Sequence, residues 1–149
     1  MAYPQVGGKQ FFAYPGGVAA VFASELTRKG LFEALKARRC YAASFEKILV
    51  WTESNGAPMG SEIEAASAEI DILVSCTHGS LTEVIVVKNG EVAASFGNFG
   101  EDRGFEQKRK TFRLLWRDPD FSDESCYYVR ATQFDGDMAW SSPIWIRPS

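Results

Sequence analysis

The chain of 149 residues is 46% hydrophobic and 23% charged, with a formal net charge of -3. This composition is that of a folded protein, and the length suits one core better than two. The weak negative charge argues against a general nucleic-acid binder. No apolar run approaches the roughly 20 residues of a membrane span, and residues 1–10 lack the apolar segment of a signal peptide. We therefore expect a soluble, cytoplasmic protein with no nucleic-acid or membrane partner.

Residues 1–44 form the first predicted unit, a loop and one helix. Residues 1–23 are rich in Gly, Pro and aromatic side chains, and a helix is predicted over 27–39. Ser24 or Thr27 can cap its N-terminus by accepting backbone N–H bonds. Basic residues crowd its last turn, where cations suit the helix dipole, and we expect the helix to end near Arg39 or Cys40.

Residues 45–149 form the second predicted unit, in which the apolar period changes to two. Ala68, Ile70, Ile72, Val74 and Cys76 fall on one face of a half-buried strand. The dipeptide at 89–90 is Asn-Gly, a strong signal for a two-residue hairpin. The pattern predicts about seven strands, with no room for helical crossovers between them. The first predicted strand ends at Ser54. The other six span 68–76, 81–88, 92–96, 109–117, 126–134 and 139–146.

This strand pattern predicts the fold class. The chain is mainly β, with an antiparallel immunoglobulin- or fibronectin-like β-sandwich preceded by the loop and the helix. The three cysteines at 40, 76 and 126 are expected to be reduced, because the spacing around Cys76 and Cys126 lacks the Trp and Tyr of an immunoglobulin disulfide.

Residues suited to catalysis are scarce. His78 is the one histidine, no Cys-x-x-Cys or His-x-His occurs, and no G-x-S-x-G elbow accompanies His78. The only acidic cluster with metal-like spacing contains Asp118, Asp120 and Asp123, and it fails the EF-hand pattern. These three carboxylates are weak candidates for a Mg²⁺ or Mn²⁺ site, and a solvated turn is the alternative. We assign no catalytic residue and no cofactor to this chain.

Charge and aromatic residues suggest binding surfaces. Residues 28–47 carry six bases and two acids, whereas residues 48–87 carry six acids and no base. Arg109, Arg113 and Arg117 share one predicted strand face, which indicates either anion binding or a solvated sheet face. Trp51, Trp140 and Trp145 are candidates for a carbohydrate platform, although Trp140 and Trp145 are predicted on opposite strand faces and Trp116 in the core.

Three stretches, within 14–42, 55–62 and 127–146, resemble one known family. They read YPGGVAAV at 14–21, LTR at 26–28 followed by LFEALKARRCYA at 31–42, NGAPMGSE at 55–62, and YYVR at 127–130 followed by MAWSSPIWI at 138–146. Together they resemble the C-terminal part of a large bacterial family related to the PHP (polymerase and histidinol phosphatase) superfamily. The resemblance implies metal-dependent phosphoesterases whose catalytic part is a distorted β/α barrel that binds divalent metals through His and carboxylate side chains. No barrel ligand can be carried over to this chain.

We therefore predict a non-catalytic accessory or interaction domain. Its partner is expected to be a PHP-type barrel domain, or its own copy in a homodimer, because exposed apolar patches favour association. The residues expected at the interface are Phe11, Phe12, Val18, Val21 and Phe22. A carbohydrate- or anion-binding module is the first alternative, and a phosphoesterase that uses Asp118, Asp120 and Asp123 is the second.

Overall fold

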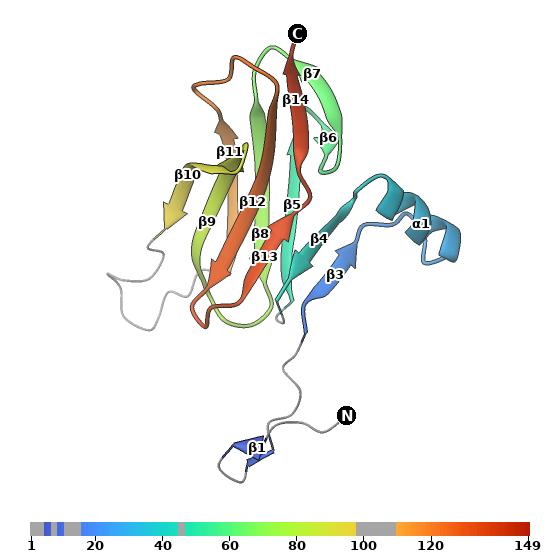
Figure 1. Ribbon diagram of the computed structural model, residues 1–149, viewed down its shortest axis with the longest axis vertical. Coiled ribbons are helices and arrows are strands. Elements are labelled where there is room, and N and C mark those ends of the chain that lie inside the picture. The colour runs from blue at the N-terminus through green and yellow to red at the C-terminus, as the bar shows by residue number, and fades with distance from the viewer. Residues whose placement is uncertain (1–4, 7–8, 11–15, 45–46, 98–109) are drawn as a thin grey trace.

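The computed structural model describes residues 5–6, 9–10, 16–44, 47–97 and 110–149. Its regular structure consists of two larger β-sheets, a separate two-stranded pair and one helix, α1 (Arg28–Lys36). In Figure 1 the larger sheet lies in front of the smaller one, and α1 projects to one side beyond the strand β4. The protein is thus mainly β, consistent with the predicted β-sandwich. None of the described helical residues forms a segment long and apolar enough to cross a membrane.

The larger sheet has eight strands. Six lie in the order β10-β9-β12-β13-β4-β3, while β14 pairs with β12 and with β7. Among the pairings in the described residues β7 and β14 run parallel, which departs from the expected antiparallel arrangement. The strands are β3 (Val18–Val21), β4 (Cys40–Ala43), β7 (Glu62–Ala65), β9 (Leu81–Lys88), β10 (Glu91–Gly97), β12 (Ser125–Gln133), β13 (Met138–Ser141) and β14 (Ile144–Pro148).

The smaller sheet has four strands in the order β11-β8-β5-β6. These are β5 (Ile48–Ser54), β6 (Ala57–Pro58), β8 (Glu69–Cys76) and β11 (Thr111–Arg117). A separate pair joins β1 (Gln5–Val6) to β2 (Lys9–Gln10).

One core lies between the two sheets. Ile70, Ile72 and Val74 of β8 are buried to 1% exposure or less, and they share the core with Val86 of β9 and Val129 of β12. The period-two pattern at 68–76 therefore marks the buried face correctly. The Asn-Gly turn is also confirmed, because Asn89 and Gly90 both have positive φ, at 52° and 90°.

Helix α1 is shorter than predicted. Thr27 caps it, with its Oγ1 accepting the Gly30 N–H at 3.0 Å, but the helix stops at Lys36 and not near Arg39. Arg38 adopts a left-handed φ of 56°, and its Nε donates to the Gly60 carbonyl. A Cβ at Gly60 would lie 2.4 Å from the Ala37 carbonyl oxygen, so a glycine is needed where the loop after β6 meets the end of α1.

Two further expectations need correction. The strand predicted over 139–146 is interrupted at Pro143, which has no N–H for a ladder bond, and it becomes β13 and β14. Residues 1–44 were expected to contribute a loop and a helix, yet β3 and β4 lie in the larger sheet, where β4 pairs with β13. These four-residue strands are too short to show a period in the sequence.

Candidate functional site

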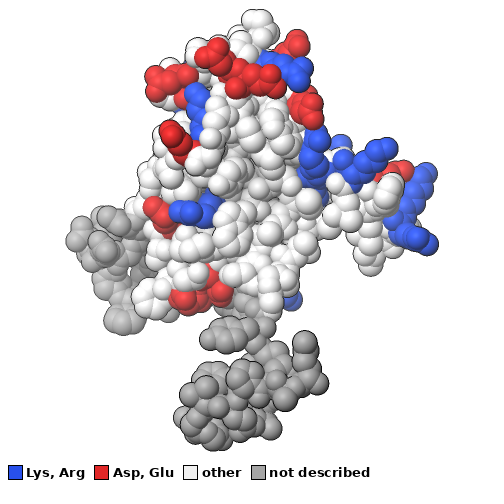
Figure 2. Space-filling model, in the orientation of Figure 1, with Lys and Arg blue, Asp and Glu red and all other residues white. Residues whose placement is uncertain are grey.

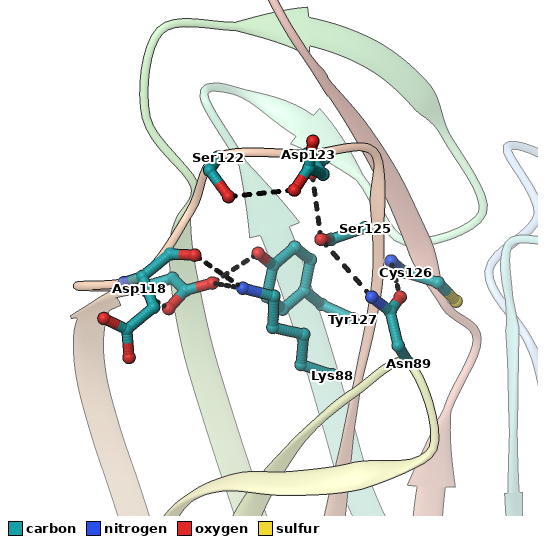
Figure 3. A network of polar contacts seen from close by, with 9 residues as sticks. Lys88, Asn89, Asp118, Ser122, Asp123, Ser125, Cys126 and Tyr127 are labelled. Atoms are coloured by element: carbon teal, nitrogen blue, oxygen red, sulfur yellow. Dashed lines mark hydrogen bonds and ion pairs between the residues drawn. The ribbon is translucent and has the colours of Figure 1, made fainter.

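Asp118, the first of the three acidic candidates, is the first residue of the loop that follows β11 and lies in a network of polar contacts (Figure 3). Its side chain is 3% exposed, and its Oδ2 lies 2.6 Å from the Lys88 Nζ. The Tyr127 hydroxyl donates to the same oxygen at 2.6 Å. Lys88 and Tyr127 stand directly opposite each other on β9 and β12, so the sheet register places both groups beside Asp118.

The partners of Asp118 keep it ionised. Burial by itself raises the pKa of this carboxyl, but the Lys88 ammonium, the Tyr127 hydroxyl and the Asp120 N–H together hold it below its ordinary value. Burial, and the hydrogen bond to the Asp118 carboxylate, raise the pKa of Tyr127. The Tyr127 hydroxyl is therefore held protonated as a hydrogen-bond donor.

Hydrogen bonds connect the end of the acidic loop, residues 122–126, with Asn89 of the β9–β10 turn. The Asn89 Oδ1 accepts the Cys126 N–H at 2.8 Å, and the Ser125 hydroxyl donates to the Asp123 carbonyl at 2.9 Å. The Asp123 carboxylate accepts a hydrogen bond from the Ser122 hydroxyl (Figure 3). The Lys88 Nζ also donates to the Asp120 carbonyl at 3.0 Å, so the loop is joined to the end of β9 as well as to the turn.

This geometry bears on the metal candidates. Asp118 uses Oδ2 for Lys88 and Tyr127 and Oδ1 for the Asp120 N–H, so a cation would have to displace the Lys88 ammonium. Among the described residues, no three Asp, Glu, His or Cys side chains gather as a metal site requires. The network joins strands β9 and β12 to the loop that follows β11, and we call it the Asp118 latch because it holds this loop against the larger sheet.

Two of the arginine candidates, Arg113 and Arg117, lie on the outer face of the smaller sheet. Arg113 forms an ion pair with Asp71 at 3.5 Å, and Arg117 pairs with Glu69, both on the neighbouring strand β8. Their charge is thus balanced within the sheet, although both guanidinium groups are well exposed. Arg109 lies outside the described residues.

The tryptophan candidates do not form a single platform. Trp51 is half-buried against Phe22, with ring centroids 4.7 Å apart. Trp140 and Trp145 were expected on opposite faces, but the break at Pro143 changes the alternation and places both on the outer face of the larger sheet. The Arg38 guanidinium lies 4.7 Å above the Trp145 ring. Trp116 packs against the core, as predicted.

The interface candidates fall partly on β3. Val18 is 47% exposed, and Val21 is half-buried. Phe22, which follows β3, is also half-buried and packs against Tyr41 and Trp51. Phe11 and Phe12 lie outside the described residues.

The three cysteines are free thiols, and the Cys76 Sγ donates to the Lys110 carbonyl at 3.3 Å. The His78 carbonyl accepts a hydrogen bond from the Gln133 amide.

Three large apolar side chains at α1 are exposed in the described part of the chain. Leu26 is 93% exposed, Phe32 66% and Leu35 51%. They line an open hollow together with Leu31, the N-cap residue Thr27 and the first two residues of the helix, Arg28 and Lys29. Figure 2 shows basic side chains around this helix and acidic ones gathered at the upper end of the molecule. The α1 surface, as we call Leu26, Leu31, Phe32 and Leu35, is therefore apolar with a basic rim.

Comparison with known proteins gives relatives in one bacterial genus. The chain is 34% identical over 143 residues to an uncharacterised protein of Chlamydia muridarum (strain MoPn / Nigg). It is 32% identical to one of Chlamydia trachomatis serovar D and 34% identical to one of Chlamydia pneumoniae. Each match covers 89% of this chain but 23% of the relative, so the chain spans about a quarter of the length of these proteins. No family model and no solved structure matches.

Proposed function

We propose that this chain is a non-catalytic accessory domain that docks on another protein domain through the α1 surface. The observation that carries the proposal is the exposure of Leu26, Phe32 and Leu35 on one short helix. A nine-residue helix is marginal in water by itself and usually depends on the packing of its apolar side. Here that side faces outward, which is expected of a surface that a partner covers.

The partner is expected to combine apolar and acidic groups. Arg28, Lys29 and Lys36 border the α1 surface and carry the positive charge of this region. An apolar groove with carboxylates at its rim would satisfy both properties. The relatives contain about three times as much chain outside the matched segment as within it, so such a partner can belong to the same longer protein.

The resemblance to the PHP-related family supplies one identity for this partner. Under the proposal, the sandwich is an immunoglobulin- or fibronectin-like appendage, and α1 docks on a PHP-type barrel. Divalent metals and phosphoester chemistry would then belong to the barrel. The structural use of Asp118 by Lys88 and Tyr127 supports a non-catalytic role for this chain.

A co-expression experiment tests the docking. The part of the C. muridarum relative outside the matched segment is co-expressed with the tagged chain and recovered on the tag. We expect Phe32→Asp and Leu35→Asp to abolish recovery, because each places a charge in an apolar contact. Leu115→Asp, at a 61% exposed position on β11, is the matched control and should retain it. Absence of binding by the unmodified chain, or equal loss in the control, would contradict the proposal.

A second experiment tests the absence of catalysis. The chain is incubated with Mn²⁺, Zn²⁺ and Mg²⁺, desalted, and examined for metal content by plasma mass spectrometry and for hydrolysis of p-nitrophenyl phosphate. We expect neither retained metal nor turnover. Stoichiometric metal that is lost in Asp120→Asn and Asp123→Asn would favour the phosphoesterase alternative.

One observation favours a carbohydrate-binding alternative. Tyr128, Trp140 and Trp145 all lie on the outer face of the larger sheet, where aromatic rings can stack on sugars. Titration of tryptophan fluorescence with oligosaccharides tests this function. A saturable change that Trp140→Ala removes would support it, and an unchanged spectrum would exclude it for the sugars used.

A further inference from the structure

An open sheet edge presents unpaired backbone groups to any extended chain, and proteins usually guard such edges. Most edges of the two sheets carry a recognisable guard. Strand β10 begins with Glu91 and contains an irregularity between Val92 and Ala94, and β7 carries Glu62 and Glu64. Strand β11 carries Arg113 and Arg117, while β6 is two residues long and contains a proline.

Strand β3 has none of these guards. It forms one end of the larger sheet, and among the described strands it pairs only with β4. Its sequence is Val-Ala-Ala-Val, without a charge or a proline, and its pairing with β4 is regular along all four residues. Val18 and Ala19 are exposed. In Figure 1 it is the outermost strand on the side of α1.

The register shows which backbone groups face outward. The Phe22 N–H donates to the Arg39 carbonyl, so Phe22 and Arg39 are a hydrogen-bonded pair in the register that aligns Val21 with Cys40. In an antiparallel ladder these pairs alternate with non-bonded ones. Ala20 therefore bonds to β4, whereas the N–H and C=O groups of Ala19 and Val21 point away from it.

Two outward-facing residues separated by one residue make this edge complementary to itself. In an antiparallel pairing with Ala20 opposite Ala20 of a second copy, Ala19 faces Val21 of the copy and Val21 faces Ala19. Each of these two pairs can exchange both of its backbone hydrogen bonds. The side chains that meet are small and uncharged, so neither a clash nor like-charge repulsion opposes the contact.

We propose that β3 is a dimerisation edge, at which two copies of this chain join their larger sheets about a twofold axis near Ala20. Because the same edge serves both copies, the assembly closes at two and does not grow into a filament. The proposal uses backbone groups of β3 and does not rest on the docking of the α1 surface. It deepens the expectation of a homodimer by assigning the contact to Ala19 and Val21.

Sedimentation equilibrium of the 149-residue chain at micromolar concentrations tests the proposal. We expect a monomer–dimer equilibrium whose dissociation constant rises by about tenfold or more in Ala19→Pro, which removes one outward donor from each copy. The substitution leaves the β3–β4 ladder intact, because the Ala19 N–H does not bond to β4. Ala19→Lys should weaken the dimer as well, since it supplies the missing guard.

Val92→Lys is the matched control, because Val92 is an exposed valine on the guarded edge strand β10. It should leave the dissociation constant unchanged. Hydrogen exchange gives an independent readout: the Ala19 and Val21 amides should become protected as the concentration rises. Three results would overturn the proposal: a chain that stays monomeric, a dimer insensitive to both Ala19 variants, or equal weakening by Val92→Lys. The first of these would leave the edge to a strand of another protein.

Discussion

The network around Asp118 and the α1 surface differ in how their groups are satisfied. Asp118 is buried with its charge, and Lys88, Tyr127 and the Asp120 N–H supply its partners from the same chain. The side chains of Leu26, Phe32 and Leu35 are apolar, yet nothing in the described part of the chain covers them. The first region is complete as a structural element. The second leaves its apolar side chains exposed, and this difference is our reason for proposing α1 as the docking surface.

The largest expected effect follows from removing the charge of Asp118. Asp118→Asn leaves the Lys88 ammonium without its counter-charge, and breaking a buried ion pair costs about 3 kcal/mol of the free energy of unfolding. Urea denaturation measures this change. Asp71→Asn is the control, because its ion pair with the exposed Arg113 should contribute less than about 1 kcal/mol. Equal effects of the two substitutions would contradict a structural latch at Asp118.

A smaller effect is expected for Tyr127→Phe. The change removes the hydrogen bond to Asp118 but leaves the ion pair with Lys88, so we expect a loss of about 1–2 kcal/mol in the free energy of unfolding. In the background of Asp118→Asn the same substitution should cost less. This double-mutant cycle measures the coupling between the two side chains. Purely additive losses would show that the two groups act separately.

The latch should also make stability depend on pH. The folded-state pKa of Asp118 lies below its ordinary value of 3.8. Its stabilising contribution is therefore full above that ordinary value and is lost as the pH falls through it toward the folded-state pKa. Denaturation curves between about pH 7 and pH 3 should show a steeper decline for the unmodified chain than for Asp118→Asn. Parallel declines would place the acid sensitivity elsewhere.

Patterns within a few residues of sequence predicted the strands and the turn. The roles of the candidate site residues depend instead on contacts between residues that are far apart in the sequence. The alternation over 68–76 and the Asn-Gly turn act within a few residues, so they could be identified without any neighbour. The role of Asp118 depends on Lys88, thirty residues earlier, and on the register of β9 with β12. In the same way, the shared face of Trp140 and Trp145 depends on an interruption at Pro143 that continuous alternation does not reveal. Strand β3 is only four residues long, and its place at the edge of the larger sheet follows from its pairing with β4.

The smallest expected effect on stability belongs to the α1 surface, where substitutions should weaken association instead. Phe32 and Leu35 are exposed, so Phe32→Asp and Leu35→Asp should change the free energy of unfolding by about 0.5 kcal/mol or less. A partner that buries these side chains gains about 1.5–3 kcal/mol from each, so the same substitutions should weaken docking by about tenfold or more. Thermal denaturation and co-expression recovery measure the two effects side by side. A large loss of stability would show that α1 is held by this chain, and the contrast with the Asp118 latch would fail.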